Sequence, residues 1–132
     1  MRKMRVLLAD DHPGLLHAVR NLLKTDADVV GCVDNGESLF DAAMKLHPDV
    51  IVTDISMPKL NGIEAVKRLR ESGCSAKIVF LTVHDDPDVV RTALSTGALG
   101  YVLKSSVTTD LLVAIREALA GHAFVSTEAS AE

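Results

Sequence analysis

Side chains that could take part in a reaction or bind a metal ion stand at the ends of several apolar runs of this sequence. If these runs are parallel strands, their carboxyl ends share one edge of a sheet, and open α/β sheets bind ligands outside that edge. Three acids, a hydroxyl and an ammonium gathered there would form a charged pocket suited to a hard cation and a phosphoryl group. The residues concerned are Asp10, Asp11, Asp54, Thr82 and Lys104.

The acids predict a metal-dependent phosphoryl acceptor. Carboxylates that share a pocket raise each other's pKa unless a cation neutralises them. Oxygen ligands suit Mg²⁺, Mn²⁺ or Ca²⁺ rather than zinc, and Mg²⁺ is commonly held by one or two carboxylates plus phosphate. Asp54 stands apart from the pair Asp10-Asp11 and could act as a nucleophile through an aspartyl-phosphate. Lys104 would then neutralise the phosphoryl oxygens, and the Ser56 carbonyl could join the metal ligands.

Each of these residues also has a simpler structural explanation. Asp10 or Asp11 could cap the helix that follows, with Pro13 in its first turn. Thr82 alone could be an ordinary strand residue, and Lys104 alone could be a solvated lysine. Their joint occurrence at the ends of four of the apolar runs favours a site.

The elements that position this pocket alternate along the chain. Apolar runs are separated by segments with helical periodicity, which predicts a parallel sheet covered by helices on both faces. We expect a flavodoxin-like α/β fold with five flanking helices and five parallel strands in the order 2-1-3-4-5. Its switch point would lie between strands one and three, where the acids are. The expected strands are 4–9, 29–33, 50–53, 77–82 and 100–103.

Length and composition exclude several classes of protein. The 132 residues fit one domain, and no apolar stretch approaches the ~18 residues of a membrane span. The net charge of −4 comes without a basic stripe, so the domain itself is not expected to bind nucleic acid. Cys32 and Cys74 lack metal or redox spacing and are expected to be reduced packing residues. No secretory signal is visible, so we expect a cytoplasmic protein.

The sequence contains Asp10-Asp11, Asp54-x-x-Met57-Pro58 with Gly62, Thr82, and Gly100-Tyr101 before Lys104. With these motifs, the chain resembles over residues 4–121 the receiver domain of two-component response regulators, which has the CheY-like form of this fold. The resemblance implies that Asp54 accepts phosphate from a phosphohistidine of a sensor histidine kinase. It implies a Mg²⁺ site at Asp10, Asp11, Asp54 and the Ser56 carbonyl, with Lys104 on the phosphoryl group.

The resemblance also implies a switch. Thr82 and Tyr101 would be its two residues: Thr82 would move toward the phosphoryl group and vacate space into which Tyr101 rotates. The surface of helix four, strand five and helix five would change as a result. Ser56 and His84 occupy two positions that the family varies to tune phosphoryl lifetime. Such a domain is not an enzyme acting on other substrates, since it promotes only its own phosphorylation and dephosphorylation.

Within the family, Asp10-Asp11-His12-Pro13 and Gly97-Ala98-x-Gly100-Tyr101 look like the NarL/LuxR-type branch. We therefore expect residues 1–121 to form the receiver domain. Residues 122–132 would be a tail or linker toward a helix-turn-helix domain that is absent from this chain. DNA would be contacted only through that domain, in a regulator of transcription. No membrane partner is expected, and phosphorylation could produce a homodimer.

Four alternatives stay open at this point. The first is a natural single-domain regulator. The second is a haloacid-dehalogenase-type phosphatase, although that family usually needs a second acid where Ser56 stands. The third is an FMN-binding flavodoxin, although Asp10 and Asp11 would repel a phosphate with no metal present. The fourth is a receiver that works as a binding module without phosphorylation.

Overall fold

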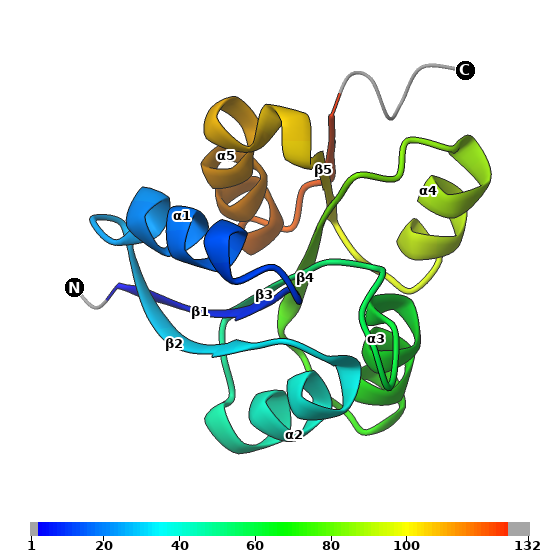
Figure 1. Ribbon diagram of the computed structural model, residues 1–132. Coiled ribbons are helices and arrows are strands. Elements are labelled where there is room, and N and C mark those ends of the chain that lie inside the picture. Colours follow the sequence, from blue (N-terminus) through cyan, green and yellow to red (C-terminus); the bar gives the residue numbers. More distant parts are fainter. Residues whose placement is uncertain (1–2, 127–132) are drawn as a thin grey trace.

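The computed structural model describes residues 3–126 as alternating strands and helices (Figure 1). A 3₁₀ turn, Lys104–Ser106, separates the strand Gly100–Leu103 from the helix Val107–Leu119. The strands are β1 Met4–Ala9, β2 Ala27–Val33, β3 Val50–Thr53, β4 Lys77–Thr82, β5 Gly100–Leu103 and β6 Phe124–Val125. The helices are α1 Pro13–Leu23, α2 Gly36–Leu46, α3 Gly62–Glu71, α4 Pro87–Leu94 and α5 Val107–Leu119.

The strands form one parallel sheet in the order β2-β1-β3-β4-β5-β6. The expected order 2-1-3-4-5 is confirmed, and the second strand begins two residues earlier than expected. β1 and β3 pair in register up to their carboxyl ends, where Ala9 pairs with Thr53, and Thr53 also pairs with Phe80 of β4. The segments that follow β1 and β3 therefore start next to each other at the same edge of the sheet.

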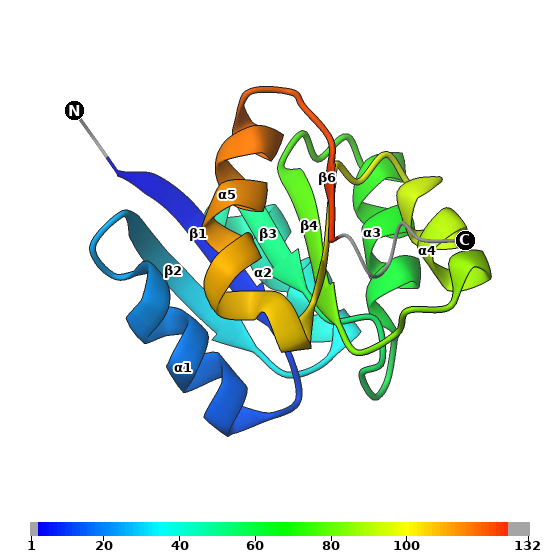
Figure 2. The same ribbon diagram turned by 90° about the horizontal axis from the view of Figure 1, so that it is seen from above.

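Alternate residues of each strand enter two separate cores, as expected for a sheet covered on both faces. One core packs the sheet against α2, α3 and α4 and contains the large side chains of Leu7, Phe80 and Tyr101. The other packs the opposite face against α1 and α5 and contains Leu8 and Ile115. Figures 1 and 2 show these two helix layers on either side of the sheet.

The sixth strand corrects the expectation of five strands. Residues 122–132 were expected to be a tail, but Phe124 and Val125 pair in parallel with Gly100 and Tyr101 of β5. Ser126 is fully buried beyond them. Two residues are too few to show a strand periodicity, so the sequence pattern did not reveal this element. The part of the expected tail from 127 to 132 lies outside the described residues.

Within residues 3–126, no helix is both long enough and apolar enough to cross a membrane.

Candidate functional site

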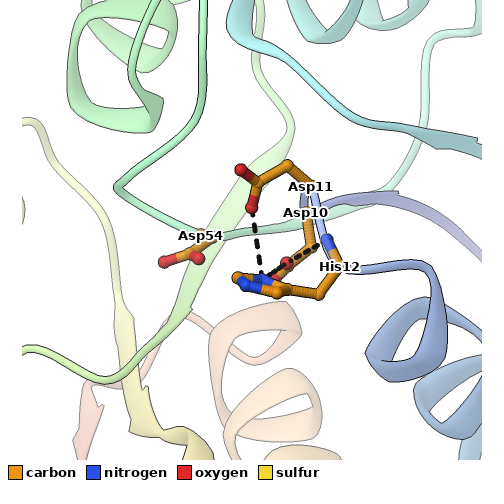
Figure 3. A group of neighbouring side chains, drawn as sticks. All are labelled: Asp10, Asp11, His12 and Asp54. Atoms are coloured by element: carbon orange, nitrogen blue, oxygen red, sulfur yellow. Dashed lines mark hydrogen bonds and ion pairs between the residues drawn. The ribbon is translucent and has the colours of Figure 1, made fainter.

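The acids expected to meet at the edge of the sheet do meet there. Potential ligand atoms of Asp10, Asp11, His12 and Asp54 all lie within 4.8 Å of one another, and Figure 3 shows the four side chains gathered together. The convergence follows from the sheet, because the Asp54 N–H donates to the Ala9 carbonyl at 2.9 Å. The ends of β1 and β3 are thereby fixed next to each other.

Asp10 is buried in the pocket and does not cap α1. The residue preceding that helix is His12, whose side chain makes no capping hydrogen bond. Asp10 Oδ1 accepts the His12 N–H at 2.9 Å, which sets the direction in which the chain enters the helix. Within residues 3–126 no hydrogen bond of good geometry reaches the buried Asp10 Oδ2. Its contact with Lys104 Nζ at 2.9 Å is an ion pair, so this oxygen keeps lone-pair capacity for a cation.

Lys104 bridges two buried carboxylates from the end of β5. Its Nζ donates to Asp54 Oδ2 at 2.9 Å and lies equally close to Asp10, while Asp54 Oδ1 accepts the Ile55 N–H at 2.7 Å. Burial acts to lower the pKa of Lys104, but its close contacts with the Asp54 and Asp10 carboxylates and their negative charges outweigh burial and raise that pKa above its ordinary value. The ammonium is therefore charged at neutral pH and fixed beside Asp54.

His12 is a member of the cluster to which sequence reasoning gave no role. Its Nδ1 lies 2.9 Å from Asp10 Oδ1 and 3.2 Å from Asp11 Oδ1, and Figure 3 shows the ring beside both acids. The side chains of His12 and Asp11 are more exposed than that of Asp10. The ring thus covers the solvent side of the pocket, and its position directly after two aspartates was the available signal.

The hydroxyl groups of Ser56, Thr82 and Tyr101 all contact His84 and not Asp54. His84 Nε2 lies 2.7 Å from Ser56 Oγ, and the Tyr101 hydroxyl donates to the His84 carbonyl at 2.7 Å. Buried Thr82 accepts the His84 N–H in a long contact of 3.4 Å. Within the described residues Thr82 shows no hydrogen bond to Asp54. The roles of Thr82 and Tyr101 as a switch and of the Ser56 carbonyl as a ligand stay predictions.

Tyr101 is fully buried, with its ring tilted against Phe80 at a centroid distance of 6.4 Å. Burial, followed by the negative charges of Asp54, Asp85 and Asp86, raises the pKa of its hydroxyl to about 12. The phenol is therefore neutral at physiological pH and acts as a hydrogen-bond donor.

The loop after Asp54 is held by close backbone approaches. Gly62 begins α3, and its N–H donates to the Ile55 carbonyl at 2.7 Å. A Cβ at Gly62 would lie 1.9 Å from the Asp54 carbonyl oxygen, and one at Gly36 would lie 1.9 Å from that of Leu60. Real Cβ atoms do not approach so closely, so both positions require glycine for the loop to keep this path.

Comparison with known proteins agrees with this geometry. Residues 6–116 match the family described as "Response regulator receiver domain". The nitrate/nitrite response regulator protein NarL of Escherichia coli K12 is 42% identical over 123 residues, which cover 92% of this chain. The chain spans 57% of the length of that curated relative.

Solved structures show the same fold. A LuxR-family two-component response regulator from Aurantimonas sp. SI85-9A1 has a TM-score of 0.92 and 30% identity, covering 98% of this chain and 94% of its own. The isolated REC domain of RcsB from Salmonella enterica serovar Typhimurium, solved in the presence of phosphomimetic BeF₃⁻, has a TM-score of 0.89 and 31% identity. It covers 98% of this chain and 97% of its own.

Proposed function

The chain belongs to the response regulator receiver domain family, and from that premise we propose that Asp54 accepts a phosphoryl group from a phosphohistidine of a sensor histidine kinase. A carboxylate oxygen of Asp54 attacks phosphorus, the P–N bond breaks, and the imidazole leaves. The observation that carries this proposal is the bridging of Asp54 and Asp10 by Lys104 Nζ at 2.9 Å from each. An ammonium in that position also neutralises charge on the incoming phosphoryl oxygens.

Mg²⁺ is the cofactor that fits the donor set. Asp10, Asp11 and Asp54 would hold it through carboxylate oxygens, with the Ser56 carbonyl as a further ligand. Support comes from the buried Asp10 Oδ2, which keeps capacity for a cation, and from the clustering of the acids. Oxygen ligands of this kind suit Mg²⁺. When bound, the ion supplies positive charge to the phosphoryl oxygens and relieves repulsion among the acids.

The signal is proposed to leave through α4, β5 and α5. Tyr101 lies in β5 and bonds to His84 in the loop before α4, which supports a link between the Asp54 pocket and that surface. Since the chain spans only part of its curated relatives, we infer that the output is a helix-turn-helix domain outside this chain, through which a cytoplasmic regulator binds DNA. A homodimer formed on phosphorylation belongs to the same proposal.

The alternative chemistries are not favoured. A phosphatase of the dehalogenase type needs an acid at the position of Ser56, and the Ser56 hydroxyl instead contacts His84. An FMN phosphate would meet the carboxylates of Asp10 and Asp11, which follow β1.

Labelling with a small phosphodonor tests the proposal. Incubation with phosphoramidate and Mg²⁺ is expected to add one acid-stable, hydroxylamine-sensitive phosphoryl group, detected by intact-protein mass spectrometry. Asp54→Asn is expected to abolish the label, and the matched variant Asp41→Asn, at an exposed acid of α2, is expected to keep it. Full labelling of Asp54→Asn would reject Asp54 as the acceptor, and loss of labelling on chelation of Mg²⁺ would support the cofactor.

A further inference from the structure

Ser126 lies at the end of the short strand β6, which runs along the outer edge of β5 (Figure 2). Although it follows the last residue of that strand, it is fully buried. Its N–H donates to the Tyr101 carbonyl at 2.8 Å. Its Oγ accepts the Leu103 N–H at 3.1 Å and donates to Asp110 Oδ2 at 3.0 Å. One residue thus contacts both β5 and the first turn of α5.

The Leu103 N–H needs this partner. Leu103 is buried at the end of β5, and β6 stops after pairing Val125 with Tyr101, so the ladder of backbone hydrogen bonds does not extend to Leu103. A buried N–H without an acceptor is strongly unfavourable, because it has lost its hydrogen bond to water. The Ser126 hydroxyl supplies the acceptor, and Asp110 takes the hydroxyl proton.

This arrangement holds the backbone on both sides of Lys104. Leu103 directly precedes Lys104, and the 3₁₀ turn Lys104–Ser106 leads into α5, which carries Asp110. Ser126 therefore fixes the two ends of the turn from which Lys104 reaches Asp54. Loosening the turn would let the ammonium move away from its 2.9 Å contact with Asp54.

We propose that Ser126 is a positioning residue for phosphoryl transfer, which completes the acceptor site by fixing Lys104. This inference rests on the proposed function of Asp54 and deepens it. A displacement of about 1 Å at a reacting group can cost up to a hundredfold in rate, and the ion pairs of Lys104 limit the displacement here. We therefore expect Ser126→Ala to slow phosphoramidate labelling about tenfold.

A double-mutant cycle on the full chain tests whether Ser126 acts through Lys104. Labelling rates are measured for the unsubstituted chain, Ser126→Ala, Lys104→Ala and the double variant. The expected result is that Ser126→Ala slows labelling in the presence of Lys104 and adds little once Lys104 is gone. Val125→Ala, which removes apolar contact from β6 but keeps the Ser126 hydroxyl, serves as the control and is expected to retain most of the rate.

Three results would overturn the inference: an unchanged rate in Ser126→Ala, an equal slowing in both Lys104 backgrounds, or an equal slowing by Val125→Ala. A second readout is independent of phosphorylation. The coupling between Lys104 and Asp54, obtained from urea unfolding of single and double variants, is expected to weaken when Ser126 is alanine. If the unsubstituted chain takes no label, the phosphoacceptor proposal fails, and an unchanged coupling would separately reject the role of Ser126.

Discussion

Replacing Lys104 by methionine removes the cation that lies between two buried carboxylates. Lys104 Nζ is 2.9 Å from Asp10 and 2.9 Å from Asp54, and the three side chains are only 15%, 5% and 4% exposed. Methionine keeps most of the length and apolar character of the side chain, so the change chiefly removes charge. The two aspartates then repel each other with no ammonium between them, and the free energy of unfolding is expected to fall.

The size of the loss follows from the distances and the burial. Each contact at 2.9 Å corresponds to about 6 kcal/mol of Coulomb attraction at an effective dielectric constant of ~20. Much of this attraction is offset by the desolvation of the charges, and removing one partner of a buried pair costs about 3–5 kcal/mol. Because the ammonium retains some exposure, we expect the lower end, about 3 kcal/mol. With a urea slope of about 2 kcal/mol/M, the midpoint would fall by about 1.5 M.

Urea unfolding with a chelator present measures this loss without a divalent cation that could replace the ammonium. Lys67→Met serves as the control, because Lys67 forms an exposed pair with Glu64 at 3.5 Å and should cost less than about 1 kcal/mol. Adding Asp54→Asn to Lys104→Met should restore part of the stability, since it removes one of the two unpaired charges. A loss below about 1 kcal/mol in Lys104→Met would show that solvent screens the site, and the electrostatic reasoning would be wrong.

Two further predictions concern Tyr101 and Gly36. The chain has one tyrosine and no tryptophan, so absorbance on alkaline titration reports on Tyr101 alone. It should ionise near pH 12, above its ordinary pKa of 10.0. Because Tyr101 then ionises more readily in the unfolded state than in the folded state, its contribution to the free energy of unfolding is complete below pH 10 and is lost between pH 10 and 12. Ionisation near pH 10 in the folded protein would contradict the burial. Gly36→Ala, whose Cβ would lie 1.9 Å from the Leu60 carbonyl oxygen, should lower the free energy of unfolding by about 1–3 kcal/mol. Gly14→Ala in α1, where nothing lies within 4 Å, should not lower it, and equal losses in urea unfolding would exclude the close approach as the cause.

The sheet and the acid pocket were predictable because two independent patterns agree: the alternation of strands and helices, and the positions of the charged residues that end the strands. Strands covered on both faces are continuous apolar runs, so their ends are visible where Asp10, Asp54 and Lys104 interrupt the pattern. The order of strands then brings those ends together. The structure adds the contact of Lys104 with both acids, which depends on side-chain conformation and not on the ends of the strands.

The contacts of Ser56, His84 and Ser126 could not be read from the sequence for a different reason. Ser56 and His84 are 28 residues apart on loops, where neither periodicity nor strand register fixes side-chain direction. Ser126 follows a two-residue strand, which is too short to produce a pattern. The remaining signal was the apolar pair Phe124-Val125 in an otherwise small and polar tail. This pair indicates burial, but it does not indicate which element the pair packs against.

The buried position of Tyr101 bears on how large a free-energy change the proposed phosphorylation would have to supply. Its buried ring contacts Phe80, and its hydroxyl donates to the His84 carbonyl, so Asp54 supplies neither contact. Moving the ring into solvent would lose about 1.5–3 kcal/mol of burial and about 1 kcal/mol of hydrogen bonding. Coupling between sites is typically ~1–3 kcal/mol, which is of the same order. If Asp54 accepts the phosphoryl group, as proposed, that group does not have to create the buried arrangement of Tyr101, and it would need only to change how often that arrangement is populated.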